Sequence, residues 1–182
     1  MNLKRTAILL STAFAALLLG GCMTKPLRPV EADGTYCYRT GRAPRHKLTC
    51  TTTPVPSAAV EAKAKQFEPT PNAVTVYIVR RRWADASNRV PVSVDGQPPV
   101  STIPESFMRV RLSPGEHQLA FEWDGQRNSR TFAARANEIV FIDLVGAVWF
   151  WRTNYQWAAT DSASARRKAV VSKLIADLDL RP

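Results

Sequence analysis

Short segments in which apolar and polar residues alternate, separated by turn signals, run from residue 72 to residue 145. The clearest is Glu116–Trp123, where Leu119, Phe121 and Trp123 fall on one side of an extended chain. Pairs such as Asp95-Gly96 are strong signals for two-residue hairpin turns. Six or seven short strands with frequent turns predict an all-β sandwich or barrel. The expected strands are Val74–Arg82, Val90–Asp95, Pro98–Ile103, Phe107–Leu112, Glu116–Trp123, Asn128–Arg135 and Glu138–Val145.

The end of the chain has a different periodicity. Within Asp161–Leu180, apolar residues recur at positions i, i+3, i+4 and i+7, which places them on one face of a helix. These residues are Val171, Leu174, Ile175 and Leu178. Asp161 or Ser162 can cap the start of such a helix. The fold class that we expect is therefore mainly β: a small antiparallel β-sandwich with a C-terminal helix packed on its sheet.

The first residues have the layout of a secretory signal. Met1–Thr6 carries two basic residues, and Ala7–Leu19 is a run of 13 residues without charge. A membrane-spanning helix needs ~20 apolar residues, so this run is too short. A basic start before a short apolar stretch is typical of a signal peptide. A buried core helix, the alternative, would not need the basic head.

Leu19-Gly20-Gly21-Cys22 resembles the lipobox of bacterial lipoproteins. In that family the cysteine thiol receives diacylglycerol, the signal is cut before it, and the new amine is acylated, for example with palmitate. The resemblance implies that residues 1–21 are a signal peptide and that Cys22 is the lipidation site. Met23 stands where an aspartate would retain the protein in the inner membrane. The resemblance therefore implies a lipid anchor in the outer membrane, facing the periplasm.

The two remaining cysteines, Cys37 and Cys50, lie outside the reducing cytosol in this interpretation, where disulfides persist. Each lies in a β-branched and aromatic segment, and a turn-forming stretch at 41–46 separates them. We predict a hairpin with a cross-strand disulfide, which could add ~3 kcal/mol to stability. The two cysteines and His46 leave a tetrahedral metal site incomplete, so we expect no metal and no cofactor.

Seven of the 13 prolines lie between residues 23 and 71. We expect residues 22–71 to form a lipidated tether that contains the disulfide hairpin and one short helix. The helix is expected at Ser57–Phe67, rich in Ala, Glu and Lys, with Pro69 after its end. Residues 72–182 then form the β-sandwich domain with its helix.

Three segments of this domain resemble PEGA domains, which are small β-sandwiches of unknown function in bacterial lipoproteins. They are Val74–Arg80, Val92–Gln97 with its "V-D-G" hairpin, and Arg109–His117 with its "L-x-P-G-x-H" pattern. The similarity covers Val74 to Val145. The resemblance implies a sandwich fold. Because the shared motifs are mostly turns, it implies no catalytic residues.

The chain carries a net charge of +10, with 25 basic and 15 acidic residues. Arg80, Arg81 and Arg82 form its densest basic cluster. One interpretation is a solvated strand end, where charge protects against edge pairing. The other is an anion-binding site for lipid phosphates or an acidic polymer, since arginine fits phosphate well. We expect no nucleic-acid partner in the envelope.

Ile139–Trp151 is apolar except for Asp143. This run and the residues after it contain four aromatic side chains that we consider as a docking segment: Trp149, Trp151, Tyr155 and Trp157. A continuous apolar strand usually indicates burial on both faces, whereas Trp and Tyr also suit half-wet interfaces. Core packing and contact with a partner or the membrane surface are both open. We hypothesise contact, because polar residues alternate with the aromatic ones.

Catalytic patterns are missing from the sequence. Neither Gly-x-Ser-x-Gly nor the Ser-x-x-Lys set occurs, and His117 more often bonds across a sheet than acts as a base. We expect no enzyme, but a cell-envelope lipoprotein with a non-catalytic binding or structural role at the membrane. One alternative is that the chain is a subunit of an envelope protein assembly. It would then dock on an envelope protein partner through its aromatic segment. Another is a hydrolase of envelope polymers, which a pocket with two carboxylates, or with Ser and His, would favour.

Overall fold

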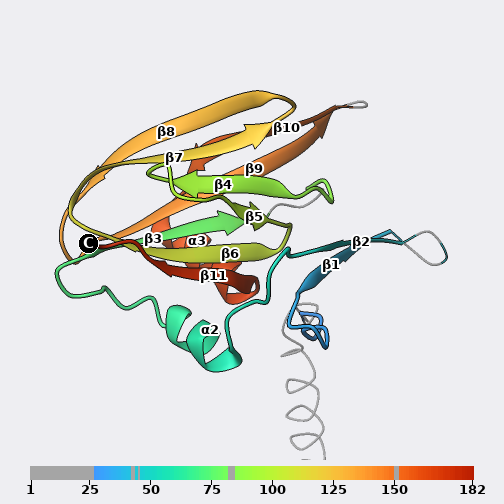
Figure 1. Cartoon of the computed structure of the whole chain (residues 1–182), viewed down its shortest axis with the longest axis horizontal. Coiled ribbons are helices and arrows are strands. Elements are labelled where there is room, and N and C mark those ends of the chain that lie inside the picture. The colour runs from blue at the N-terminus through green and yellow to red at the C-terminus, as the bar shows by residue number, and fades with distance from the viewer. Residues whose placement is uncertain (1–26, 42–43, 45, 82–84, 150–151) are drawn as a thin grey trace, which may run out of the picture.

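The computed structural model describes residues 27–41, 44, 46–81, 85–149 and 152–182 (Figure 1). In these residues a five-stranded sheet packs on a four-stranded sheet, and a separate two-stranded hairpin lies beside them. Two helices cover the other face of the five-stranded sheet. The prediction of a mainly β fold with a sandwich and a helix near the C-terminus is confirmed.

The five-stranded sheet has the order β10-β9-β3-β6-β11. Its strands are β10 (Arg152–Ala159), β9 (Ile139–Trp149), β3 (Val74–Arg80), β6 (Ser106–Leu112) and β11 (Lys173–Asp179). β3 runs parallel to β9, and β6 runs parallel to β11, so the sheet is mixed rather than purely antiparallel. Parallel neighbours need crossover connections, and the chain makes these by leaving the sheet through the second sheet or through a helix.

The four-stranded sheet is antiparallel and has the order β5-β4-β7-β8. Its strands are β5 (Val100–Thr102), β4 (Val90–Val94), β7 (Gly115–Trp123) and β8 (Gln126–Ala134). Asp95 and Gly96 have positive φ angles of 49° and 73°, as do Asp124 and Gly125 with 53° and 72°. Both pairs therefore adopt the left-handed backbone of such turns. Asp124-Gly125 joins β7 to β8 directly, whereas the longer stretch 95–99, which starts with Asp95-Gly96, separates β4 from β5.

Side chains alternate between two apolar cores, one on each face of the five-stranded sheet. Val76 and Ile78 of β3 point into the sandwich with Phe121 of β7. Tyr77 and Val79 of the same strand point toward the helices. All seven residues of β3 are buried, because layers cover this central strand on both faces.

The helix α2 (Ala58–Ala64) packs on the sandwich, although it lies in the stretch expected to act as a tether. Ser57 caps its start, as the sequence favours. The Tyr77 hydroxyl donates to the Ala64 carbonyl at 2.8 Å. Glu61, 8% exposed, pairs with Lys173 of β11 at 2.5 Å between Nζ and Oε2. The helix is therefore fixed to the sheet by apolar packing and by a buried ion pair.

The C-terminal helix α3 (Ser162–Val170) is shorter than the sequence predicts. Asp161 caps its start, accepting from the Ser164 N–H at 2.8 Å, but residues 173–179 form β11 and pair with β6. The apolar residues of this stretch fit a helical face, yet Ala176, Leu178 and Leu180 also alternate and cover the sandwich core. Pairing with β6 satisfies the backbone of this stretch and decides its structure.

The helices of the described residues do not include one long and apolar enough to cross a membrane.

Candidate functional site: a basic groove beside α2

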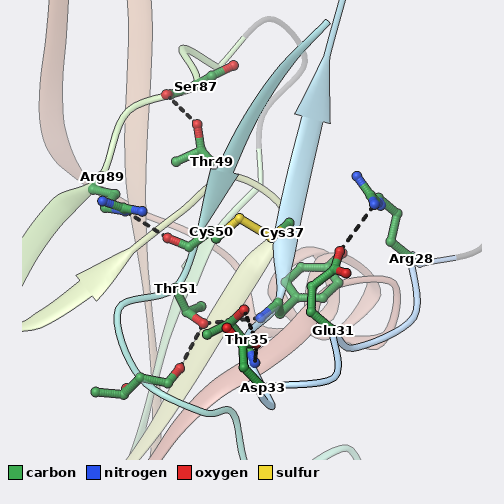
Figure 2. Close-up of a disulfide and its surroundings, with 12 residues drawn as sticks. Arg28, Glu31, Asp33, Thr35, Cys37, Thr49, Cys50, Thr51, Ser87 and Arg89 are labelled. Carbon is green, nitrogen blue, oxygen red and sulfur yellow. Dashed lines mark hydrogen bonds and ion pairs between the residues drawn. A yellow bond between two sulfur atoms is a disulfide. The ribbon is translucent and has the colours of Figure 1, made fainter.

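The predicted disulfide is present in the hairpin of β1 (Cys37–Thr40) and β2 (Lys47–Cys50). Cys37 lies directly opposite Cys50 in the register, and their sulfur atoms are 2.03 Å apart (Figure 2). The hairpin and its bridge are therefore confirmed.

The hairpin is attached to the sandwich through the loop that precedes β4. The Thr49 hydroxyl donates to the Ser87 carbonyl, and Arg89 Nε donates to the Cys50 carbonyl, each at 2.7 Å (Figure 2). Tyr36, just before β1, is 1% exposed, and this burial raises the pKa of its hydroxyl to about 12. The hairpin thus packs against the body of the protein instead of hanging free.

Arg80, the first residue of the predicted basic cluster, is 1% exposed. Its Nε and Nη2 atoms donate to the two carboxylate oxygens of Asp85 at 2.9 and 3.1 Å. Its terminal nitrogens also donate to three carbonyls and one hydroxyl, those of Ala86, Asn88, Thr102 and Tyr155. The side chain is buried because these acceptors satisfy its donors, so Arg80 has no donor left for an external anion.

The rest of that cluster does not gather around Arg80. Arg81 donates to the Val171 carbonyl at 2.9 Å and pairs with Glu105 at 3.4 Å. Arg82 lies outside the described residues. Arg80 is the last residue of β3 and lies in the interior, whereas Arg81 follows the strand and lies nearer the surface.

The aromatic segment forms the strand β10, whereas the sequence placed it beyond the last strand. Tyr155 is 6% exposed, and its ring lies 4.8 Å from that of Trp123. Trp157 is half-buried, with its ring 5.2 Å from that of Phe121. The alternation of apolar and polar residues is present, but its aromatic face turns into the sandwich. Tyr155 is therefore a buried packing residue and not part of an exposed docking face, whereas Trp157 packs on Phe121 and keeps part of its side chain exposed.

Three other residues singled out from the sequence give no side-chain geometry. Trp149 ends β9, and its side chain is not described, while Trp151 and Cys22 lie outside the described residues. Docking through Trp149 and Trp151, and lipidation at Cys22, stay predictions.

His117 links a turn to the second sheet. Its Nδ1 lies 2.7 Å from Asp95 Oδ2, and its Nε2 lies 2.7 Å from the Ser113 carbonyl oxygen. Both ring nitrogens are engaged, which fits the expected structural role. The part of the chain that the structure describes contains no cluster of three or more His, Cys, Asp or Glu able to hold a metal ion.

A groove of about 490 Å³ lies between α2, the following residues 68–71, β6 and β11. A groove of this volume is large enough for a small ligand. Its lining includes four basic and two acidic side chains: Lys63, Arg109, Arg111, Arg181, Glu68 and Asp177. We call this the basic groove.

Asp177 organises the floor of the basic groove. It accepts two hydrogen bonds from Arg109, at 2.9 and 2.7 Å, and one from Arg111 at 2.7 Å. Burial acts to raise the pKa of the Asp177 carboxyl, but the hydrogen bonds and charges of the two arginines outweigh burial and lower it. The carboxylate therefore stays ionised and holds both guanidinium groups in place.

Several donors in the basic groove stay available. Arg111 uses Nη1 for Asp177 and Nε for Asp179, and Arg181 uses Nε and Nη2 for Asp179. Hydrogen bonds from Arg181, the largest effect, hold the pKa of Asp179 below its usual value. Lys63 is exposed and forms no ion pair with another described residue. The groove can therefore bind an anion through three side chains.

The sequence analysis did not predict this site, although one signal for it was present. Arg109 and Arg111 alternate with the core residues of β6, so they had to lie on the opposite face. The other wall comes from α2 and residues 68–71, which the sequence suggested to be a linker.

No protein-family model matches this chain, and no curated protein matches it either.

Proposed function

We propose that this chain is a cell-envelope lipoprotein, anchored through Cys22, with a non-catalytic binding role at the membrane surface. The single observation that carries this is the Cys37–Cys50 disulfide, 15 residues after the lipobox cysteine. Disulfides persist outside the reducing cytosol, so the bridge supports the export that the signal-like start of the chain predicts. Met23 favours anchoring in the outer membrane. We also propose that the body of the protein is a PEGA-like domain.

The distance between the anchor and the body supports a role close to the membrane. The described chain starts at Leu27, five residues after Cys22, and five extended residues span at most ~18 Å. The Gly34 carbonyl accepts from the Val55 N–H at 2.9 Å, and Tyr36 is buried. The body therefore begins immediately after a short tether, and the basic groove provides a surface that can bind.

Fatty-acid labelling in cells tests the anchor. Cells that express the chain are grown with labelled palmitate, beside cells that express Cys22→Ala. The control is a Cys37→Ala, Cys50→Ala double variant, which retains Cys22 and should still incorporate label. Label in the wild type and control but not in Cys22→Ala supports the proposal, while label in Cys22→Ala contradicts it.

A second candidate function is docking in an envelope assembly through the end of the β9–β10 hairpin. Val148, next to Trp149, is 52% exposed and is the observation that favours it. Trp151→Ala should then abolish cross-links to the partner in cells without changing the melting temperature. A Trp151→Ala variant that keeps every cross-link would exclude this surface.

A further inference from the structure

The basic groove and the start of the described chain lie on the same side of the molecule. In Figure 1 the dark blue segment after residue 27 and α2 both lie below β11, while β7 and β8 lie on the opposite side. The Val55 N–H donates to the Gly34 carbonyl at 2.9 Å, which ties this first segment to the stretch leading into α2. The side that carries α2 is thus the side on which the described chain begins.

The short tether fixes which side faces the membrane. A domain of about 150 residues has a radius of gyration of ~15 Å. The ~18 Å that five residues can span is therefore too short to reach around the body. If Cys22 is lipidated, the side with Leu27, α2 and the basic groove stays near the lipid headgroups. This step rests on the proposed anchor.

The chemistry of the groove matches a phosphate group at that surface. Anionic lipids give membrane surfaces a negative potential that attracts nearby Lys and Arg residues. Charge-assisted hydrogen bonds from arginine to phosphate are strong, and Arg111 and Arg181 each keep one terminal nitrogen that is not used in their carboxylate pairs. Lys63 adds a third positive charge on the opposite wall.

We propose that the basic groove binds the phosphate of an anionic phospholipid headgroup in the membrane that holds the anchor. Asp177 keeps Arg109 and Arg111 in position through its ion pairs with them. The phosphate is contacted by Lys63, Arg111 and Arg181. The anchor keeps the protein on the membrane, and the groove sets the side that faces it.

Titration of the full-length lipidated protein in neutral detergent tests this proposal. The probe is phosphatidylglycerol mixed into the neutral detergent micelles, and binding is measured by calorimetry against micelles without it. The Lys63→Gln, Arg181→Gln variant should bind about 25-fold more weakly, about fivefold for each charge near an anionic surface. The matched control, Arg127→Gln with Arg130→Gln on β8, should bind like the wild type. Lys63→Gln alone, at an exposed site, should show the fivefold effect if the double variant folds poorly.

The other arms identify the source of the phosphate. Inorganic phosphate should bind much more weakly than the lipid, and equal affinity would show a free-phosphate site and overturn the headgroup assignment. Equal loss in the groove and β8 variants, or no binding of the lipid, would overturn the site itself. The mass of each preparation is measured first, so failure of the anchor is seen before any titration and is separate from failure of the groove.

Discussion

Arg80 and Asp85 form a two-point ion pair in the interior, where each side chain is 1% exposed. A buried charge costs several kcal/mol unless it is paired and hydrogen-bonded. The pair therefore holds the loop at 85–89 against the sandwich. The outer side of that loop carries Ser87 and Arg89, which bind the disulfide hairpin. Arg80 thus connects the core of the sandwich to the hairpin.

Asp85→Ala should lower the free energy of unfolding by about 3–5 kcal/mol, because it leaves the Arg80 charge buried without its partner. Urea denaturation followed by circular dichroism measures this. Glu122→Ala is the control: its pair with Arg127 is long, at 4.0 Å, and exposed, so its loss should cost less than about 1 kcal/mol. Equal effects of the two variants would contradict the structural role of Arg80.

Gly146→Ala should lower stability by about 1–3 kcal/mol through overpacking. A Cβ atom at this position would lie 2.3 Å from Asp85 Oδ1 and 2.6 Å from a ring carbon of Tyr155. The neighbours that it meets belong to the same buried network, so they have little freedom to move. The thermal midpoint of the variant gives the answer, and an unchanged midpoint would show that the network is looser than the packing indicates.

The Cys37–Cys50 bridge should be complete in the protein as it exists in the envelope. Alkylation of denatured, unreduced protein should find no free thiol at either position. The double alanine variant should lose about 2–4 kcal/mol of stability, because the bridge restricts the unfolded chain. Two reactive thiols in freshly extracted protein would be incompatible with this prediction.

Stability should fall as the pH rises from 10 to about 12. Burial raises the pKa of Tyr36 from 10.0 to about 12, and it also raises those of Tyr77 and Tyr155. Above pH 10 the unfolded chain releases these protons while the folded protein keeps them. The unfolded state is therefore stabilised relative to the folded state. Tyr36→Phe should make this fall shallower in urea titrations. If stability falls equally steeply with pH in Tyr36→Phe, the fall comes from other groups and the prediction is wrong.

Local patterns predicted much of the fold, because a strand needs only alternation and a two-residue turn needs only its own residues. The Asp124-Gly125 turn and the Cys37–Cys50 hairpin are of this kind. Residues 173–179 are different, because Leu174 and Leu178 fit one face of a helix as well as they fit a strand. Pairing with β6 makes this stretch a strand.

The site was harder to predict because it also depends on contacts between residues far apart in the sequence. Arg80 reads as surface charge beside Arg81, and its burial depends on Tyr155, 75 residues later in the chain. The basic groove brings Lys63 from α2 to Arg109 and Asp177 from two strands. Only the folded chain places these residues together.

The intact mass of the protein purified from membranes shows whether Cys22 carries the lipid anchor. We expect a chain that begins at Cys22, with residues 1–21 removed, one diacylglycerol on the thiol, and one further acyl group on the amine. Peptide mapping should place all of the added mass on the first residue. A mass equal to that of the unprocessed chain, or a free thiol at Cys22, would contradict the lipid anchor and the orientation inferred from it.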